Sequence, residues 1–252
     1  MIGISRISSP AIWGKLPDRG DYVRYRIHGH EIDDWRVWLD KQTWLQTKET
    51  PSAEDSRVWL RLTPDFGQDS PILHPLPWSF VLSPGVLPFS GRHWVIGVIS
   101  PSTDSIGRSY PLVIYQTVNQ HWLQRNLDKP LGWLYWLAQL IAGYVRPTGN
   151  NKKDLAGQLD KLWAIHSPKW VSWFASAQIS NQTACREITG QHQLAESDLC
   201  GVRYLPWANW PQLVWHSSSS DGWFWQQDEL GGFLDARCIH SESVLGIEKS
   251  YV

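Results

Sequence analysis

The chain has 252 residues, of which 42% are hydrophobic and 19% are charged, and its formal net charge is -1. This balance is typical of a globular protein that buries one substantial core, and it is unlike that of a disordered chain. No run of lysine or arginine is present, which argues against nucleic-acid binding through phosphate contacts and against an anionic membrane surface as a partner.

Targeting and redox features are few. Residues 1–20 lack the continuous apolar stretch of a secretory signal. The longest apolar run, 131–145, is shorter than the roughly 20 residues that a bilayer requires, so we expect a buried helix and no membrane insertion. Cys185, Cys200 and Cys238 are an odd number without CxxC spacing, which favours reduced thiols and a cytoplasmic protein.

The first half of the chain predicts a helix and an antiparallel meander. Turn-forming residues dominate 11–30, and a tryptophan-bearing apolar stripe predicts a helix over 31–39. Three runs of β-branched and aromatic residues predict strands at 78–82, 93–99 and 111–115. Because these runs are apolar on both faces, we expect helices on both sides of the sheet.

The second half predicts helices followed by short strands. Apolar periodicity predicts one helix over 127–144 and a second over 155–163, and Trp170, Trp173 and Phe174 suggest a third. We expect the polar residues 178–199 to form a surface excursion. The predicted strands that follow are 202–205, 213–216, 223–226 and 233–234. This order favours a single α/β domain spanning 1–252, in which helices of 126–175 and strands of 200–235 complete the fold, although two lobes stay open.

Eighteen tryptophans are the unusual feature of the composition. Tryptophan suits cores, protein interfaces and glycan-stacking platforms. Because these residues are spread along the whole chain, we expect most of them in the core. The serine tract 217–220 predicts a flexible loop, and Trp223, which comes shortly after it, is a candidate for an exposed binding residue.

The common catalytic templates are missing from the sequence. It contains no GxSxG elbow, phosphate-binding P-loop, HExxH or GxGxxG motif. The pair His28 and His30 has no further ligand at diagnostic spacing, so the sequence predicts no metal and no cofactor.

Two polar segments stand out as candidate sites. The turn Asp18-Arg19-Gly20-Asp21 is either a recognition tip or a turn locked by an Arg–Asp pair, with Gly20 in an unusual backbone conformation. The segment 100–108, rich in hydroxyl groups, is longer than a hairpin needs. In it, Arg108 either pairs with Asp104 or binds an anionic group of a partner.

These segments carry a family resemblance. Residues 14–24, GKLPDRGDYVR, followed by the WxxWL pattern at 35–39, resemble the opening signature of the TagF proteins of type VI secretion. Residues 77–86, PWSFVLSPGV, and 101–112, PSTDSIGRSYPL, are similar to later motifs of that family. Ser79 and Ser105 stand where the family commonly has arginine.

The resemblance implies a three-layer α/β sandwich with a central, largely antiparallel sheet flanked by helices. It also implies a non-enzymatic repressor of type VI secretion that binds a cytosolic forkhead-associated scaffold protein. The candidate partner-binding residues are Arg19, Asp21, Ser102, Asp104, Arg108 and Trp223. The alternatives are an accessory assembly factor of the same system, an enzyme that uses Asp21, Asp104 and a histidine, and a glycan-binding module.

Overall fold

The computed structural model describes residues 7–42, 76–127, 129, 131–145, 154–168, 177–190, 222–227, 231 and 233–239. The predicted third helix at Trp170 and the predicted strands 202–205 and 213–216 lie outside these residues. Across the described residues, no helix is both long enough and apolar enough to cross a membrane.

A seven-stranded sheet forms the centre of the molecule, and every pairing in it is antiparallel. The strands lie in the order β2-β1-β5-β4-β3-β6-β7. Their bounds are β1 (Ala11–Gly14), β2 (Val23–Tyr25), β3 (Trp78–Leu82), β4 (Trp94–Ser100), β5 (Leu112–Val118), β6 (Gly222–Gln227) and β7 (Phe233–Ile239). The predicted strands at 78–82, 93–99, 111–115, 223–226 and 233–234 are therefore confirmed, with shifts at their ends.

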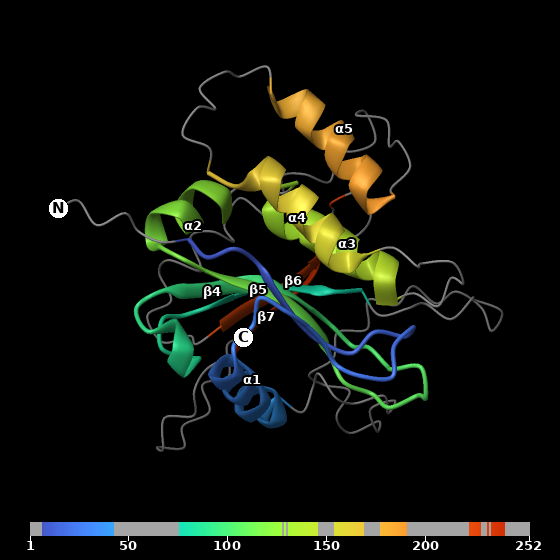
Figure 1. Cartoon of the computed structure of the whole chain (residues 1–252). Helices are drawn as coiled ribbons and strands as arrows, with labels where there is room; N and C mark the ends of the chain where they lie inside the picture. Colours follow the sequence, from blue (N-terminus) through green and yellow to red (C-terminus); the bar gives the residue numbers. More distant parts are fainter. Residues whose placement is uncertain are drawn as a thin grey trace.

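Helices cover both faces of this sheet, as Figure 1 shows. On one face lies α1 (Gly29–Lys41). On the other face lie α2 (Gln120–Leu127), α3 (Trp133–Val145), α4 (Leu155–His166) and α5 (Ala177–Thr189). The predicted three-layer α/β sandwich is confirmed.

The alternation of side chains along each strand produces two separate cores. In β6, Trp223 and Trp225 pack into the core beneath α2–α5, whereas Phe224 packs into the core that contains the α1 residues Trp35 and Trp38. Both faces of β6 are buried, so hydrophobic burial holds a helical layer on each side of the sheet.

Two helix predictions were wrong. The helix expected over 127–144 is two helices, because Pro130 and Gly132, between α2 and α3, are residues that interrupt helices. The expected surface excursion over 178–199 contains the helix α5. Cys185 and Ile188, three residues apart on α5, pack against the core of α3 and α4. Tertiary packing thus stabilises a helix whose own sequence is largely polar.

The tryptophans behave largely as predicted. Those described are buried or half-buried, and none is exposed: Trp13, Trp35, Trp38, Trp78, Trp94, Trp122, Trp133, Trp136, Trp163, Trp223 and Trp225. Trp223 is 1% exposed, so the expectation of an exposed binding residue there was wrong. β3 and β7 flank β6 in the sheet, and Trp223 lies under the helical layer.

Candidate functional site

Two polar loops emerge at the same end of the sheet. The first loop, residues 15–22, leaves the end of β1, and the second loop, residues 101–111, enters β5. Because β1 and β5 are antiparallel, with Trp13 opposite Val113, the loops begin next to each other. This places the two most distinctive motifs of the sequence in contact.

Gly14 allows the strands to approach closely at this point. Its φ angle is +133°, and a Cβ atom there would lie 2.1 Å from the carbonyl oxygen of Pro111. Any other residue would therefore be strained and would also clash with the backbone.

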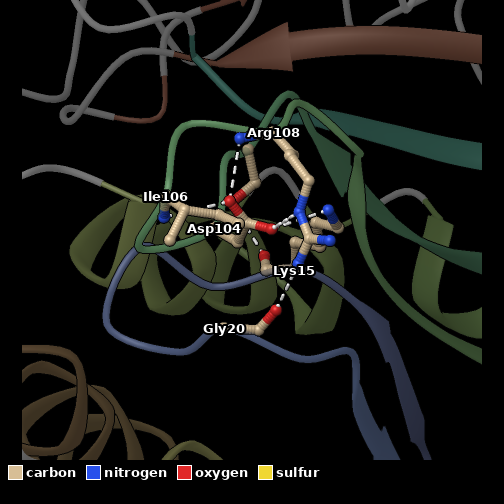
Figure 2. A network of polar contacts seen from close by, with 6 residues as sticks. Lys15, Gly20, Asp104, Ile106 and Arg108 are labelled. Atoms are coloured by element: carbon tan, nitrogen blue, oxygen red, sulfur yellow. Dashed lines mark hydrogen bonds and ion pairs between the residues drawn. The ribbon is translucent and has the colours of Figure 1, made fainter.

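Asp104 joins the two loops, as Figure 2 shows. Its Oδ2 accepts from Lys15 Nζ at 2.7 Å and from Arg108 Nε at 2.6 Å. Its Oδ1 accepts the backbone N–H groups of Arg108 at 2.8 Å and Ile106 at 3.2 Å. The predicted pairing of Arg108 with Asp104 is thus confirmed, and every lone-pair direction of the carboxylate faces a donor.

Asp104 carries its charge inside the protein. Its side chain is 0% exposed, and that of Lys15 is 6% exposed, whereas that of Arg108 is 57% exposed. Removal from water favours the protonated acid, but hydrogen bonds from Lys15 and Arg108 outweigh this effect. They hold the pKa of Asp104 well below its ordinary value of 3.8.

Further bonds fasten the backbones of the two loops together. Arg108 Nη2 donates to the Gly20 carbonyl at 2.7 Å, and the backbone N–H of Ser105 donates to the Arg19 carbonyl at 3.0 Å. Ser102 Oγ donates to the Lys15 carbonyl at 2.8 Å. Ser102 is buried, so it positions the loops from the inside.

Aromatic rings pack against one another and against Lys15 at the base of the two loops. Trp13, Tyr22 and Tyr110 form three mutual ring contacts with centroid distances of 5.1 to 6.1 Å. Lys15 Nζ lies 5.3 Å from the centroid of the Tyr22 ring. The ammonium group is therefore held between a carboxylate and an aromatic face, which compensates for its removal from water.

Arg19 and Asp21 do not lock the first loop. Both are exposed, and the side chain of neither makes a hydrogen bond or ion pair with another described residue. Gly20 has no positive φ, so the expectation of an unusual backbone conformation there was wrong. The loop is held instead by its carbonyl oxygens, and the positive φ angles occur at Gly14 and Gly107.

Together the loops present one outer face, which we call the twin-loop surface. It consists of the exposed residues Asp18, Arg19, Gly20, Asp21, Ser105, Ile106, Gly107, Arg108 and Ser109. Ile106 is 69% exposed, and it is one of two large hydrophobic residues that are exposed among those described. The other is Val37, on the outer face of α1.

The candidate residues thus separate into three groups. Arg19, Asp21 and Arg108 lie on the twin-loop surface, Ser102 and Asp104 hold it from within, and Trp223 lies in the core. The sequence analysis missed Lys15 and Ile106. Lys15 belongs to the GKLP motif, but nothing in the local sequence signals its burial.

Ser79 and Ser105, the two departures from the family resemblance noted in the sequence, have different positions. Ser79 is buried in β3, opposite Val98 of β4, whereas Ser105 is exposed on the twin-loop surface.

A shallow depression of about 220 Å³ lies near the other end of β1. It is lined by Ser8, Ser9, Ala11, Arg26, His28, Glu31, Tyr115 and Thr117. Neither Asp21 nor Asp104 reaches it. In the described part of the chain, no three His, Cys, Asp or Glu side chains gather into a cluster that could hold a metal ion.

Elsewhere, half-buried His166 and buried Cys185 form a pair, with Nε2 and Sγ 3.4 Å apart. Burial raises the pKa of Cys185 to about 12. Burial, together with the charge of Lys129, lowers the pKa of His166 to about 4. Both groups are therefore neutral near pH 7, unlike the thiolate–imidazolium pair of a nucleophilic cysteine.

Comparison with protein families shows the family to which the chain belongs. The model described as "TagF N-terminal domain, Type VI secretion system-associated" matches residues 11–162, which include both loops. The chain therefore belongs to the TagF family. A search of curated proteins found no match.

One solved structure to which this TagF protein is similar is the crystal structure of PA0076 from Pseudomonas aeruginosa PAO1. The two chains are 20% identical over 71% of this chain and 78% of that chain, with a TM-score of 0.43. The family match thus links the domain that carries the twin-loop surface to type VI secretion.

Proposed function

We propose that this TagF protein is a non-enzymatic, post-translational repressor of type VI secretion system assembly. It acts in the cytoplasm by binding the forkhead-associated scaffold protein of that system, and it contacts the scaffold through the twin-loop surface. The chain 1–252 acts as one domain. The observation that carries the proposal is the Asp104 network, which fixes two exposed loops in a single geometry.

Pre-organisation is what makes such a surface suitable for binding. Loops that are already ordered lose little conformational entropy when a partner docks. Ile106 projects from a turn held by Asp104, and an exposed apolar side chain on a rigid support is suited to fill a pocket on a partner. The polar groups around Ile106 provide the rim that protein interfaces usually have.

The enzyme alternative has less support. A general acid or base needs a pKa near the working pH, whereas the pKa of Asp104 is held well below its ordinary value and its oxygens are occupied by four donors. Asp21 lies on the open surface. The glycan-binding alternative requires exposed aromatic platforms, and the described tryptophans are buried or half-buried.

Calorimetric titration with the forkhead-associated scaffold of the same secretion cluster tests the proposal. The scaffold is used both unmodified and threonine-phosphorylated, and we expect a Kd in the micromolar range or tighter with at least one form. Ile106→Ser should weaken binding about tenfold, the loss expected when an interface anchor is removed. Val37→Ser is the matched control, because it alters the other large apolar residue that is exposed in the described part of the chain, on α1.

Two results would contradict the proposal. An absence of heat with both scaffold forms would rule out the scaffold as the partner. Binding that is unchanged by Ile106→Ser but weakened by Val37→Ser would move the contact to α1. In cells, loss of the gene should increase secretion, and reduced secretion would favour the assembly-factor alternative.

A further inference from the structure

We infer that the outward edge of the Arg108 guanidinium is the docking point for a carboxylate side chain of the protein partner. This inference names the partner chemistry of the twin-loop surface, and it therefore rests on the proposed function. Arg108 then has two simultaneous roles: one edge of its guanidinium joins the loops and the other edge is presented to the partner.

The hydrogen bonds of Arg108 leave the outward edge available. A guanidinium has five N–H groups. Nε uses its single N–H on Asp104, and Nη2 uses one on the Gly20 carbonyl. Five minus two leaves three, one on Nη2 and both on Nη1, and these make no hydrogen bond to a described residue.

Lys15 leaves the positive charge of Arg108 uncompensated. Both cations contact Asp104 Oδ2, so two positive charges share one negative charge. The Lys15 ammonium and the carboxylate are almost fully buried, whereas the Arg108 side chain is 57% exposed. The excess charge of the network is therefore available to a partner only at Arg108.

The geometry suits a carboxylate. Two neighbouring N–H groups of a guanidinium match the two oxygens of a carboxylate, which gives a bidentate and directional contact. Arg108 is held at two points before the partner arrives, so little rotamer entropy remains to be lost.

The first loop limits the partner to few negative charges. Asp18 and Asp21 are exposed on that loop together with one cation, Arg19, so two negative charges against one positive charge leave it net negative, and it would repel a run of acidic residues. The matching partner surface therefore presents one carboxylate, accompanied by an apolar contact for Ile106, and not a polyanion.

Sodium acetate provides a test that does not depend on the scaffold. The Nε–Hε NMR signal of Arg108 is assigned by its loss in Arg108→Lys. We expect acetate to shift this signal in a saturable way, and sodium chloride at the same ionic strength to leave it in place. An equal response to both salts overturns the inference.

Lys15→Met then tests the origin of the uncompensated charge. In that variant Arg108 is the single side-chain cation on Asp104, so acetate binding should weaken by at least about threefold although Lys15 is buried. An unchanged acetate titration in folded Lys15→Met overturns the inference. Should this variant not fold, Arg108→Gln is the replacement, because its side chain is largely exposed.

The scaffold titration distinguishes this inference from the proposed function. We expect Arg108→Gln to weaken scaffold binding about tenfold and to reduce its salt dependence, and Arg108→Lys to restore part of the affinity. Scaffold binding with full affinity in folded Arg108→Gln overturns the carboxylate contact and leaves the proposed function standing. If the scaffold does not bind at all, the acetate titration still decides the inference.

Discussion

Lys15 and Asp104 are 89 positions apart in the chain, and yet Lys15 Nζ lies 2.7 Å from Asp104 Oδ2. This ion pair connects the segment after β1 to the segment before β5, at one end of the sheet, where these two strands pair. A buried pair is seldom a strong source of stability, because desolvation of both ions offsets their attraction. Its more important consequence is that one loop cannot move without the other.

Asp104→Asn should weaken the connection between the loops, which then rests on the hydrogen bonds to the carbonyl oxygens of the first loop. The amide oxygen still accepts from the backbone of Ile106 and Arg108, but the amide nitrogen then faces the two cations that contacted Oδ2. We expect lower stability and a large loss of scaffold binding. Urea unfolding and calorimetry measure the two effects.

The pH dependence of this variant provides the control. The pKa of Asp104 in the folded protein is below its ordinary value of 3.8, so its contribution is complete well above pH 3.8 and is lost as the pH falls below that value. The difference in unfolding free energy between wild type and Asp104→Asn should therefore narrow in acid. A difference that stays constant to low pH would contradict the ionised, doubly paired carboxylate.

Gly14→Ala should be among the most damaging single changes in the protein. The backbone there has φ +133°, and the added Cβ would lie 2.1 Å from the Pro111 carbonyl oxygen. We expect a loss of about 3 kcal/mol or more, because backbone strain of about 1–3 kcal/mol adds to the displacement of β5.

Gly85→Ala separates backbone strain from the clash between the added Cβ and the neighbouring strand. Gly85 also has a positive φ, +85°, but nothing lies within 4 Å of the added Cβ. Its cost should be about 1–2 kcal/mol, the strain alone. Equal losses for the two variants, measured by chemical unfolding, would show that close strand approach at Gly14 is unimportant.

The central strands of the sheet could be predicted from the sequence because they are continuous apolar runs. Residues 78–82 and 94–100 contain almost nothing that favours a helix, and both of their faces are buried. The helix α5 was missed for the opposite reason. Its composition is polar, and the contacts of Cys185 with α3 and α4 are non-local.

The site shows the same division between local and non-local contacts. Asp104 and Arg108 are four residues apart in one loop, so their pairing could be predicted. The burial of Lys15 could not be predicted, because it depends on the register that places Trp13 opposite Val113. Trp223 was misassigned because the serine-rich sequence shortly before it predicted a flexible loop, whereas β6 is an interior strand of the sheet.

Trp223→Ala should affect stability and not the partner contact. The ring is 1% exposed and packs 6.1 Å, between centroids, from Trp94. Truncation of a buried tryptophan costs about 3–5 kcal/mol, because it removes apolar burial and leaves a cavity. We expect a lower unfolding midpoint, with the affinity of the remaining folded protein unchanged.

Arg19→Ala should have little effect on stability, because Arg19 lies on the exposed first loop. We expect its free energy of unfolding to stay within about 0.5 kcal/mol of wild type.

His166 should make the protein less stable in mild acid. Burial lowers its pKa from 6.5 to about 4, so between these values the unfolded chain binds a proton that the folded protein does not. The free energy of unfolding therefore falls as the pH decreases from 6.5 to 4, by about 3 kcal/mol at 1.4 kcal/mol per pKa unit. In His166→Leu the fall in unfolding free energy between pH 6.5 and 4 should vanish, which urea unfolding across pH 4–7 measures. The imidazole lies 5.3 Å, between ring centroids, from Trp133, so tryptophan fluorescence of the folded protein should follow the protonation of His166. An identical slope in wild type and His166→Leu would show that folding does not lower the pKa of His166.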